Sequence, residues 1–357
     1  MKGRSVRIPR AVVAGLVAGL LCCWPAAEPQ AQLIVGSTST STAFAGQAAA
    51  VSGFAGGSFV SVANTAVLSA SGGAQEASAM ETAVGGLAVG ESHAAVVGAG
   101  SATASEASAA NVSFTGGSSF FGGAATTIAA DFVMARGTVN CVSGVATASG
   151  VVQITGLVIN GQAVAVTGAA NQMVFLSDGG FVIINEQLAT AAGVTVNAMH
   201  VIDAMAGVNV VIASASAGIT CGGTTTSPAP PCDFVTGGGW IVGTPSGAKG
   251  NFGVAGGIKN GAFWGHLNYI DHGNGMHVKH TAVTGYAVDP NDPDCRIIDY
   301  NVTINGAPGT ARVRVCDKGE PGRDDIFEIQ LSNGYFAGGD LGGSHPGGGN
   351  IQLHKCH

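Results

Sequence analysis

The chain has 357 residues, of which 10% are charged, and its net charge is −7. Globular domains usually carry about 25% charged residues. Between Arg10 and Lys249 the sole basic residue is Arg136. This stretch therefore has too few cations to replace the counterions of nucleic acid or to bind anionic lipid, and we expect no nucleic-acid partner.

The N-terminus is typical of a secretory signal peptide. Four basic residues stand within the first ten, and residues 11–23 are then uniformly apolar or small. That apolar segment is too short to cross a bilayer, and no later segment has about 20 uninterrupted apolar residues. We expect residues 1–31 to be removed on export and the mature chain to have no transmembrane span. The sequence shows no hydrophobic sorting tail, so the protein is predicted to be secreted or held at the cell surface.

Composition changes sharply at Cys221. Residues 222–231 read GGTTTSPAPP, which is typical of a semi-extended linker. We therefore predict a first domain over 32–221, built from Ala, Gly, Ser, Val and Thr, and a second over 232–357 that holds most of the aromatic and charged residues.

The first domain shows short β-branched runs separated by turn residues, which predicts strands. Asn160-Gly161 between two such runs indicates a type I′ hairpin. The Ala-rich stretch 102–110 fits either a helix or a small-residue strand. The expected runs are 59–62, 127–133, 151–159, 181–184, 194–196 and 208–212.

The second domain shows clearer hairpins. Segments 296–304 and 310–315 flank a turn that contains Asn305-Gly306, and 327–331 alternates apolar with polar residues. The fold class is thus all-β: two β-sandwich-like domains joined by a Thr/Pro-rich linker, after an N-terminal signal peptide. A β-solenoid is the alternative for the first domain, although no fixed period is present.

Six cysteines follow the signal segment, and an even number in an exported chain predicts disulfides. With Asn305-Gly306 as a two-residue loop, Cys295 and Cys316 face each other across the hairpin. Other connectivities of the four cysteines in the second domain stay open. The predicted pairs are Cys141–Cys221, Cys295–Cys316 and Cys232–Cys356.

Several motifs together resemble a known family. The segments AFAGQAAAV (43–51), SASGGAQEAS (69–78), FVIINEQ (181–187), TVNAMHV (195–201) and VNVVIASASAGITC (208–221) resemble the choice-of-anchor P family of exported bacterial proteins. The second domain, from CDFVTGGGWI (232–241) to GGGNIQLHK (347–355), is similar to the post-COAP module that follows such domains. The resemblance implies a surface or secreted protein and no catalytic residues.

Histidines are concentrated around one predicted hairpin. If Gly273-Asn274-Gly275 is a three-residue loop, Asn268 pairs with residue 280, and three imidazoles share one strand face. Such a face could bind Zn²⁺ or Cu²⁺, but a solvated outer face of a hairpin is the favoured interpretation, and a register change of one residue moves His280 to the other face. The candidate transition-metal ligands are His266, His272 and His280.

Acidic loops offer a second candidate metal site. Oxygen-rich loops suit Ca²⁺, but ordinary turn chemistry explains the same residue types. A further acidic loop contains Asp289, Asp292 and Asp294. The candidate Ca²⁺ ligands are Asp317, Glu320, Asp324 and Asp325.

Catalytic groups are poorly supported. Glu186, His200 and Asp203 occur close together, but the apolar frame VNAMHVI favours a hydrogen-bonded core histidine. We expect Trp240 to lie in a core, whereas exposed aromatics would suit sugar or protein contact. The favoured function is an exported structural or interaction protein without catalytic activity or cofactor, whose partner is an extracellular protein or polysaccharide. The alternatives are a Ca²⁺- or carbohydrate-binding module and, last, a hydrolase with a dispersed site.

Overall fold

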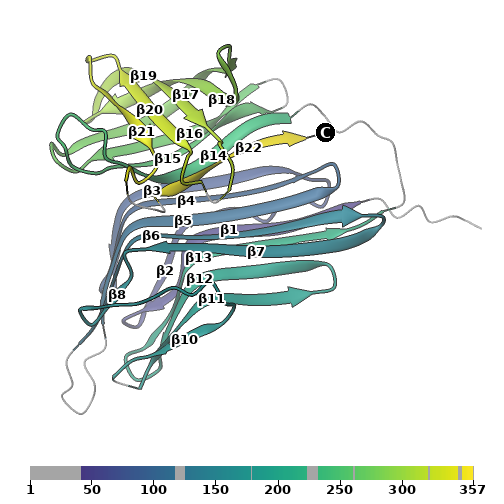
Figure 1. Ribbon diagram of the computed structural model, residues 1–357, viewed down its shortest axis with the longest axis vertical. Helices are drawn as coiled ribbons and strands as arrows, with labels where there is room; N and C mark the ends of the chain where they lie inside the picture. The colour runs from purple at the N-terminus through teal and green to yellow at the C-terminus, as the bar shows by residue number, and fades with distance from the viewer. Residues whose placement is uncertain are drawn as a thin grey trace, which may run out of the picture. The chain divides into compact units, whose positions relative to one another are not determined.

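Strands and turns make up the described part of the chain, as the alternating and β-branched segments predicted. The computed structural model describes residues 42–116, 125–177, 179–222, 232–259, 262–320, 322–344 and 348–356. Within these residues the protein is all-β, with antiparallel strands in three sheets (Figure 1). No helix among them could cross a membrane. The predicted signal segment 1–31 and residues 223–231 of the predicted linker lie outside the described residues.

The first half of the described chain, from Ala43 to Thr220, folds into two sheets. The six-stranded sheet has the order β10-β11-β12-β13-β1-β2. Its strands are β1 (Ala43–Ala55), β2 (Ser58–Asn64), β10 (Gln172–Phe175), β11 (Phe181–Thr190), β12 (Gly193–Asp203) and β13 (Val208–Thr220). The seven-stranded sheet has the order β3-β4-β5-β6-β8-β9, with β7 paired to β6. Its strands are β3 (Gly73–Val84), β4 (Leu87–Ala99), β5 (Ala102–Gly116), β6 (Thr126–Val142), β7 (Val145–Thr155), β8 (Val158–Ile159) and β9 (Gln162–Ala163).

The core of the first half lies between these two sheets. Alanine and β-branched residues fill it, with Ala50, Val51, Val182 and Ile212 fully buried. Small side chains let the sheets pack closely with few aromatic residues, of which Phe114 is buried in this core. The Ala-rich stretch 102–110 belongs to β5 and is therefore strand. The first half is thus a sandwich and not a solenoid.

One predicted strand is broken. Residues 151–159 were expected to form a single strand, but β7 ends at Thr155 and β8 begins at Val158. Gly156 stands at the break with a φ of 67°, a left-handed conformation that glycine adopts at low cost.

The second half forms one sheet of nine strands and not the pair of sheets that a sandwich needs. Each strand from β14 to β21 pairs with the next, and β22 returns beside β14. Phe252 of β15 stacks on Phe327 of β20 with ring centroids 3.9 Å apart, so the sheet curls around its own core. The strands are β14 (Cys232–Ile241), β15 (Gly250–Lys259), β16 (Ala262–Asp271), β17 (Met276–Asp289), β18 (Asp292–Ile304), β19 (Ala307–Cys316), β20 (Ile326–Leu331), β21 (Phe336–Asp340) and β22 (Gly349–Cys356).

Asn-Gly pairs form the turns of two hairpins, as predicted. Asn305-Gly306 and Asn160-Gly161 are both two-residue loops with positive φ at each residue, the type I′ geometry. Because of the first loop, Cys295 pairs directly with Cys316.

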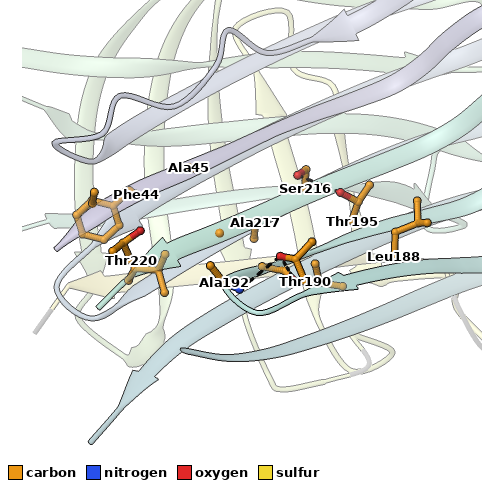
Figure 2. A pocket seen from close by; sticks show the side chains of 14 residues that line it. Phe44, Ala45, Leu188, Thr190, Ala192, Thr195, Ser216, Ala217 and Thr220 are labelled. Atoms are coloured by element: carbon orange, nitrogen blue, oxygen red, sulfur yellow. Dashed lines mark hydrogen bonds between the residues drawn. The ribbon is translucent and has the colours of Figure 1, made fainter. Parts of the chain in front are cut away.

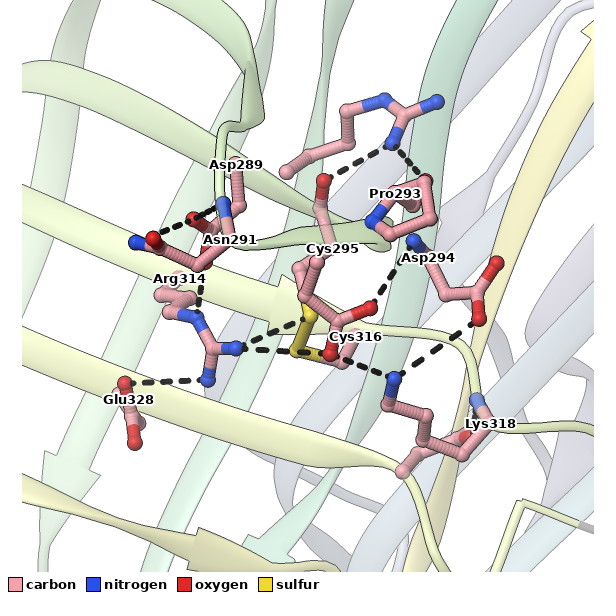
Figure 3. Close-up of a disulfide and its surroundings, with 12 residues drawn as sticks. Asp289, Asn291, Pro293, Asp294, Cys295, Arg314, Cys316, Lys318 and Glu328 are labelled. Atoms are coloured by element: carbon pink, nitrogen blue, oxygen red, sulfur yellow. Dashed lines mark hydrogen bonds and ion pairs between the residues drawn. A yellow bond between two sulfur atoms is a disulfide. The ribbon is translucent and has the colours of Figure 1, made fainter.

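Two of the predicted disulfides are present. Cys295 is joined to Cys316 (Figure 3), and Cys141 is joined to Cys221. The backbones of Cys232 and Cys356 pair opposite each other, as the predicted clasp requires, but their side chains lie outside the described residues.

Candidate functional site

A layer of polar side chains lies where the seven-stranded sheet meets the nine-stranded sheet. Gly238 and Gly253 are cross-strand neighbours in the nine-stranded sheet. A Cβ on Gly238 would stand 2.8 Å from Ser108 Oγ, and one on Gly253 would overlap the Glu91 carboxylate. The two glycines therefore let the sheets approach closely. We call the polar side chains between the two sheets the polar layer. Its members are Glu76, Ser78, Glu91, His93, Glu106, Ser108, Arg136, Asn251, His266, Asn268, His280, Asn350 and His354.

The centre of the polar layer is a chain of ring and carboxylate contacts. His93 of β4 is fully buried, and its Nδ1 lies 3.1 Å from Nε2 of His266 on β16. Nδ1 of His266 contacts the Glu76 carboxylate of β3. Asn268 donates to Ser78 Oγ at 2.9 Å in the same layer. These contacts join residues from the two halves of the chain.

Burial and neighbouring charges perturb the ionisation of this layer. Burial, and after it the charge of nearby His266, lower the pKa of His93 to about 3, so the imidazole is neutral at physiological pH. Burial alone would raise the pKa of Glu76, but its contact with His266 outweighs burial and lowers the pKa to about 2. Burial raises the pKa of Glu91 well above its usual range.

A buried ion pair lies beside the histidines. Arg136 of β6 donates from Nε and Nη2 to Oε2 of Glu106 on β5, at 2.9 and 2.8 Å. Both side chains are almost fully buried. Nη1 of Arg136 contacts Glu320, and Nδ2 of Asn350 donates to the same Glu106 oxygen at 3.2 Å. Arg136, the single cation of the first half, therefore contacts acids from both halves.

The predicted histidine cluster forms only in part. The loop after β16 contains four residues, 272–275, so Asn268 pairs with Lys279 and not with His280, and the predicted register is wrong by one residue. His266 and His280 still lie close, with ring centroids 6.1 Å apart, because β17 is irregular directly after His280. His272, six residues from His266, is roughly 20 Å further along the strand.

Side chains outside the predicted set contact two of the predicted ligands, His272 and His266. Nε2 of His272 lies 3.0 Å from Nδ2 of Asn111. Glu76 and His93, which the sequence analysis did not single out, are the groups that contact His266. The three predicted transition-metal ligands therefore do not share one site.

The predicted Ca²⁺ ligands also point to separate partners. Asp325 is fully buried and accepts from the backbone N–H groups of Lys318 and Ile351, each at 2.7 Å. Burial raises its pKa to about 7. Asp317 accepts from Leu353 N–H at 2.8 Å, and Glu320 contacts Arg136. Asp324 lies exposed in the turn beside Asp325. Asp325 and Asp317 therefore anchor the loop to β22, Glu320 contacts β6, and the four acids do not surround a common site.

The acidic loop near the second disulfide is neutralised by cations (Figure 3). Nε of Arg314 donates to Asp289 at 2.6 Å, and Nζ of Lys318 donates to Asp292 at 2.6 Å. Among the described residues, one group of three potential metal ligands is close enough to hold an ion, and it consists of Asp292 with the bonded Cys295 and Cys316.

Trp240 is buried, as predicted, but its surroundings differ from those expected. It packs against Ala110, Phe132 and Met134 of the seven-stranded sheet, and Lys249 Nζ lies 4.3 Å from the centre of its ring. Trp240 therefore joins the two halves and does not lie inside the core of the second half.

The outward side of the six-stranded sheet is open. The strands that pack mainly against this sheet, within the described residues, all belong to the seven-stranded sheet and cover its other side. A chain of hydrogen bonds crosses this open face. It runs from Ser214 to Asn197 at 2.7 Å, to Glu186 at 2.7 Å, to His200 at 2.9 Å and to Asn209 at 2.9 Å.

The open face also carries exposed aromatic side chains. Phe54, Phe59 and Phe175 are 49%, 67% and 77% exposed. Asp203, by contrast, accepts from Met205 and Ala206 N–H groups and closes a turn. His200 is hydrogen-bonded, as predicted, and with Glu186 and Asn209 it braces neighbouring strands, but it lies on the outward face of the sheet and not in a core.

An open hollow of about 390 Å³ lies at the other end of the six-stranded sheet (Figure 2). Threonine and serine hydroxyls from Thr190, Thr195 and Ser216 line it together with alanine methyl groups and Leu188. None of its described lining residues is an acid, histidine, lysine or cysteine. The hollow offers apolar and hydroxyl contacts but no general acid or base among those residues.

Comparison with known proteins gives no relative: no family model matches the sequence, and no curated protein or solved structure is similar to it. Membership of the choice-of-anchor P family therefore stays a prediction.

Proposed function

We propose that this protein is an exported structural or interaction protein without catalytic activity, and that the open face of its six-stranded sheet is its contact surface. The observation that carries the proposal is the exposure of Phe54, Phe59 and Phe175 on a face that no other described sheet covers. A folded chain rarely leaves large aromatic side chains on one face unless they meet a partner.

The rest of the molecule fits a scaffold. Two disulfides and the buried ion pair fix the sheets that lie behind the open face. Disulfides persist in oxidising compartments, which supports export and the resemblance to a family of surface proteins. A rigid sheet presents a contact surface at little entropic cost.

Charge substitutions on the open face test the proposal. In Phe59→Glu and Phe175→Glu, a carboxylate replaces an exposed ring, so each should weaken retention of the protein on washed cell envelopes by roughly 30-fold, the effect of losing about 2 kcal/mol at an interface centre. The readout is the fraction of protein that remains with the envelope after washing.

Val145→Glu is the matched control, because Val145 is 65% exposed on β7 of the other sheet. It should leave retention unchanged. Equal retention of all three variants and the wild type would show that the open face is not the contact surface.

A further inference from the structure

A row of five apolar side chains and one asparagine crosses all six strands of the open face. Strand register places Phe175 beside Phe181, Phe181 beside Ile202, Ile202 beside Asn209, Asn209 beside Phe54, and Phe54 beside Phe59. Directly paired residues point to the same side of a sheet. We call these six residues the aromatic row; they are Phe175, Phe181, Ile202, Asn209, Phe54 and Phe59.

The exposed surface of the aromatic row is the right size for the centre of a protein interface. Its three most exposed rings offer roughly 400 Å² of apolar surface, since a phenylalanine side chain presents about 150–250 Å² in total. A standard interface buries about 800 Å² on each partner, with an apolar centre and a polar rim. A hollow of about 380 Å³ lies between Ile202 and Phe54 in the middle of the row and can receive a side chain from the partner.

The chemistry of the face favours an uncharged apolar partner. The next row holds Met173, Ile183, His200, Val211, Ser52 and Ser61. His200 is the one titratable group in the two rows, and both of its ring nitrogens are engaged, with Glu186 and Asn209. A sugar needs free donors and acceptors beside the aromatic rings, whereas His200 and Asn209, the polar groups nearest the rings, bond to each other.

The aromatic row is complementary to itself. Two phenylalanines stand at each end, Phe175 with Phe181 and Phe54 with Phe59, while Ile202 and Asn209 occupy the middle. A two-fold axis that runs along the strands between Ile202 and Asn209 brings one aromatic pair over the other in a second copy. Two-fold dimers with one self-complementary surface are the commonest protein oligomers. Two copies of a chain with a net negative charge repel each other unless the contact is uncharged, and the six residues of the aromatic row carry no charge.

We infer that the open face packs against the open face of a second copy, so that Phe175 and Phe181 of one chain lie over Phe54 and Phe59 of the other. This inference rests on the proposed function, because it names the partner of the same contact surface. The sheets would then stack about 10 Å apart, as two sheets do in a sandwich.

Sedimentation of the mature protein at micromolar concentration tests the inference. We expect twice the monomer mass for the wild type and for Val145→Glu, and the monomer mass for Phe59→Glu and Phe175→Glu. A monomeric wild type, or a dimer that survives both substitutions, would overturn it.

A cysteine pair tests the orientation. Phe175 and Phe59 stand on the first and last strands of the six-stranded sheet, roughly 24 Å apart, too far for a bridge within one chain. In the double variant Phe175→Cys/Phe59→Cys, the predicted axis places the two positions opposite each other between copies, about 10 Å apart across the stacked sheets. A bifunctional thiol cross-linker of about that length should therefore give a covalent dimer. Phe175→Cys alone should give none; a dimer from the single variant alone would contradict the axis.

The two proposals fail separately. If the wild type sediments as a monomer and the glutamate variants lose envelope retention, the proposed contact surface stands and the second copy is refuted. A face-dependent dimer that is found inside the cell keeps the second copy and refutes the exported function.

Discussion

Replacing Arg136 by leucine should lower the free energy of unfolding by about 3–5 kcal/mol, the usual cost of breaking a buried ion pair. The substitution removes both guanidinium bonds to Glu106 and leaves that carboxylate buried between two sheets. Burial already raises the pKa of Glu106 in spite of the Arg136 charge, so the orphaned acid takes up a proton, which limits the loss. The measurement is the urea midpoint at constant pH.

Two variants make this prediction specific. The double variant Arg136→Leu/Glu106→Leu removes both charges and should recover most of the lost stability, since an apolar pair replaces buried ions at little cost. Arg312→Leu breaks an exposed pair with Asp299 and should cost less than about 1 kcal/mol. A double variant as unstable as Arg136→Leu would show that the loss does not come from the uncompensated Glu106 carboxylate.

The second large expected effect is a loss of folding stability at acid pH. The pKa of His93 falls from its ordinary value of 6.5 to about 3 in the folded protein. The stability that depends on neutral His93 is therefore fully present above pH 6.5 and is lost as pH falls toward 3, because the unfolded chain binds a proton that the folded chain excludes. The loss is about 1.4 kcal/mol per pH unit.

His93→Asn should remove this slope, so its stability relative to the wild type should improve as pH falls from 6.5 to 3. Glu91→Gln is the matched counterpart in the same layer with the opposite sign. Because burial raises the pKa of Glu91, the wild type loses stability as pH rises above 4.5, and the variant should gain relative to it. Denaturation at several pH values measures both; curves parallel to the wild type in both variants would contradict the buried, neutral state of the layer.

Local chemistry explains which parts of the fold could be predicted. Asn160-Gly161 and Asn305-Gly306 fix type I′ loops by themselves, and the second loop then fixes the Cys295–Cys316 pair. The loop 272–275 carries two glycines and an asparagine that fit three or four residues equally well, so the register after it could not be chosen. A shift of one residue reverses every side chain.

A different reason explains why the polar layer could not be predicted from the sequence. His93 and His266 stand 173 residues apart, and no sequence period connects a residue on one sheet with its neighbour on the next. The aromatic row left a weak signal in the sequence: Phe181 and Ile183 alternate with Val182 and Ile184, so that strand is apolar on both faces. One face packs on the core, and the other is the face that we propose to be the contact surface.

The central claim is that the chain acts outside the cytoplasm as a disulfide-locked β scaffold. The most direct measurement is the recovery of the native protein from medium, envelope and cytoplasm, followed by peptide mapping without reduction. We predict protein in the medium or envelope, with Cys141 linked to Cys221 and Cys295 linked to Cys316. Native protein in the cytoplasm with these four thiols free would contradict the claim.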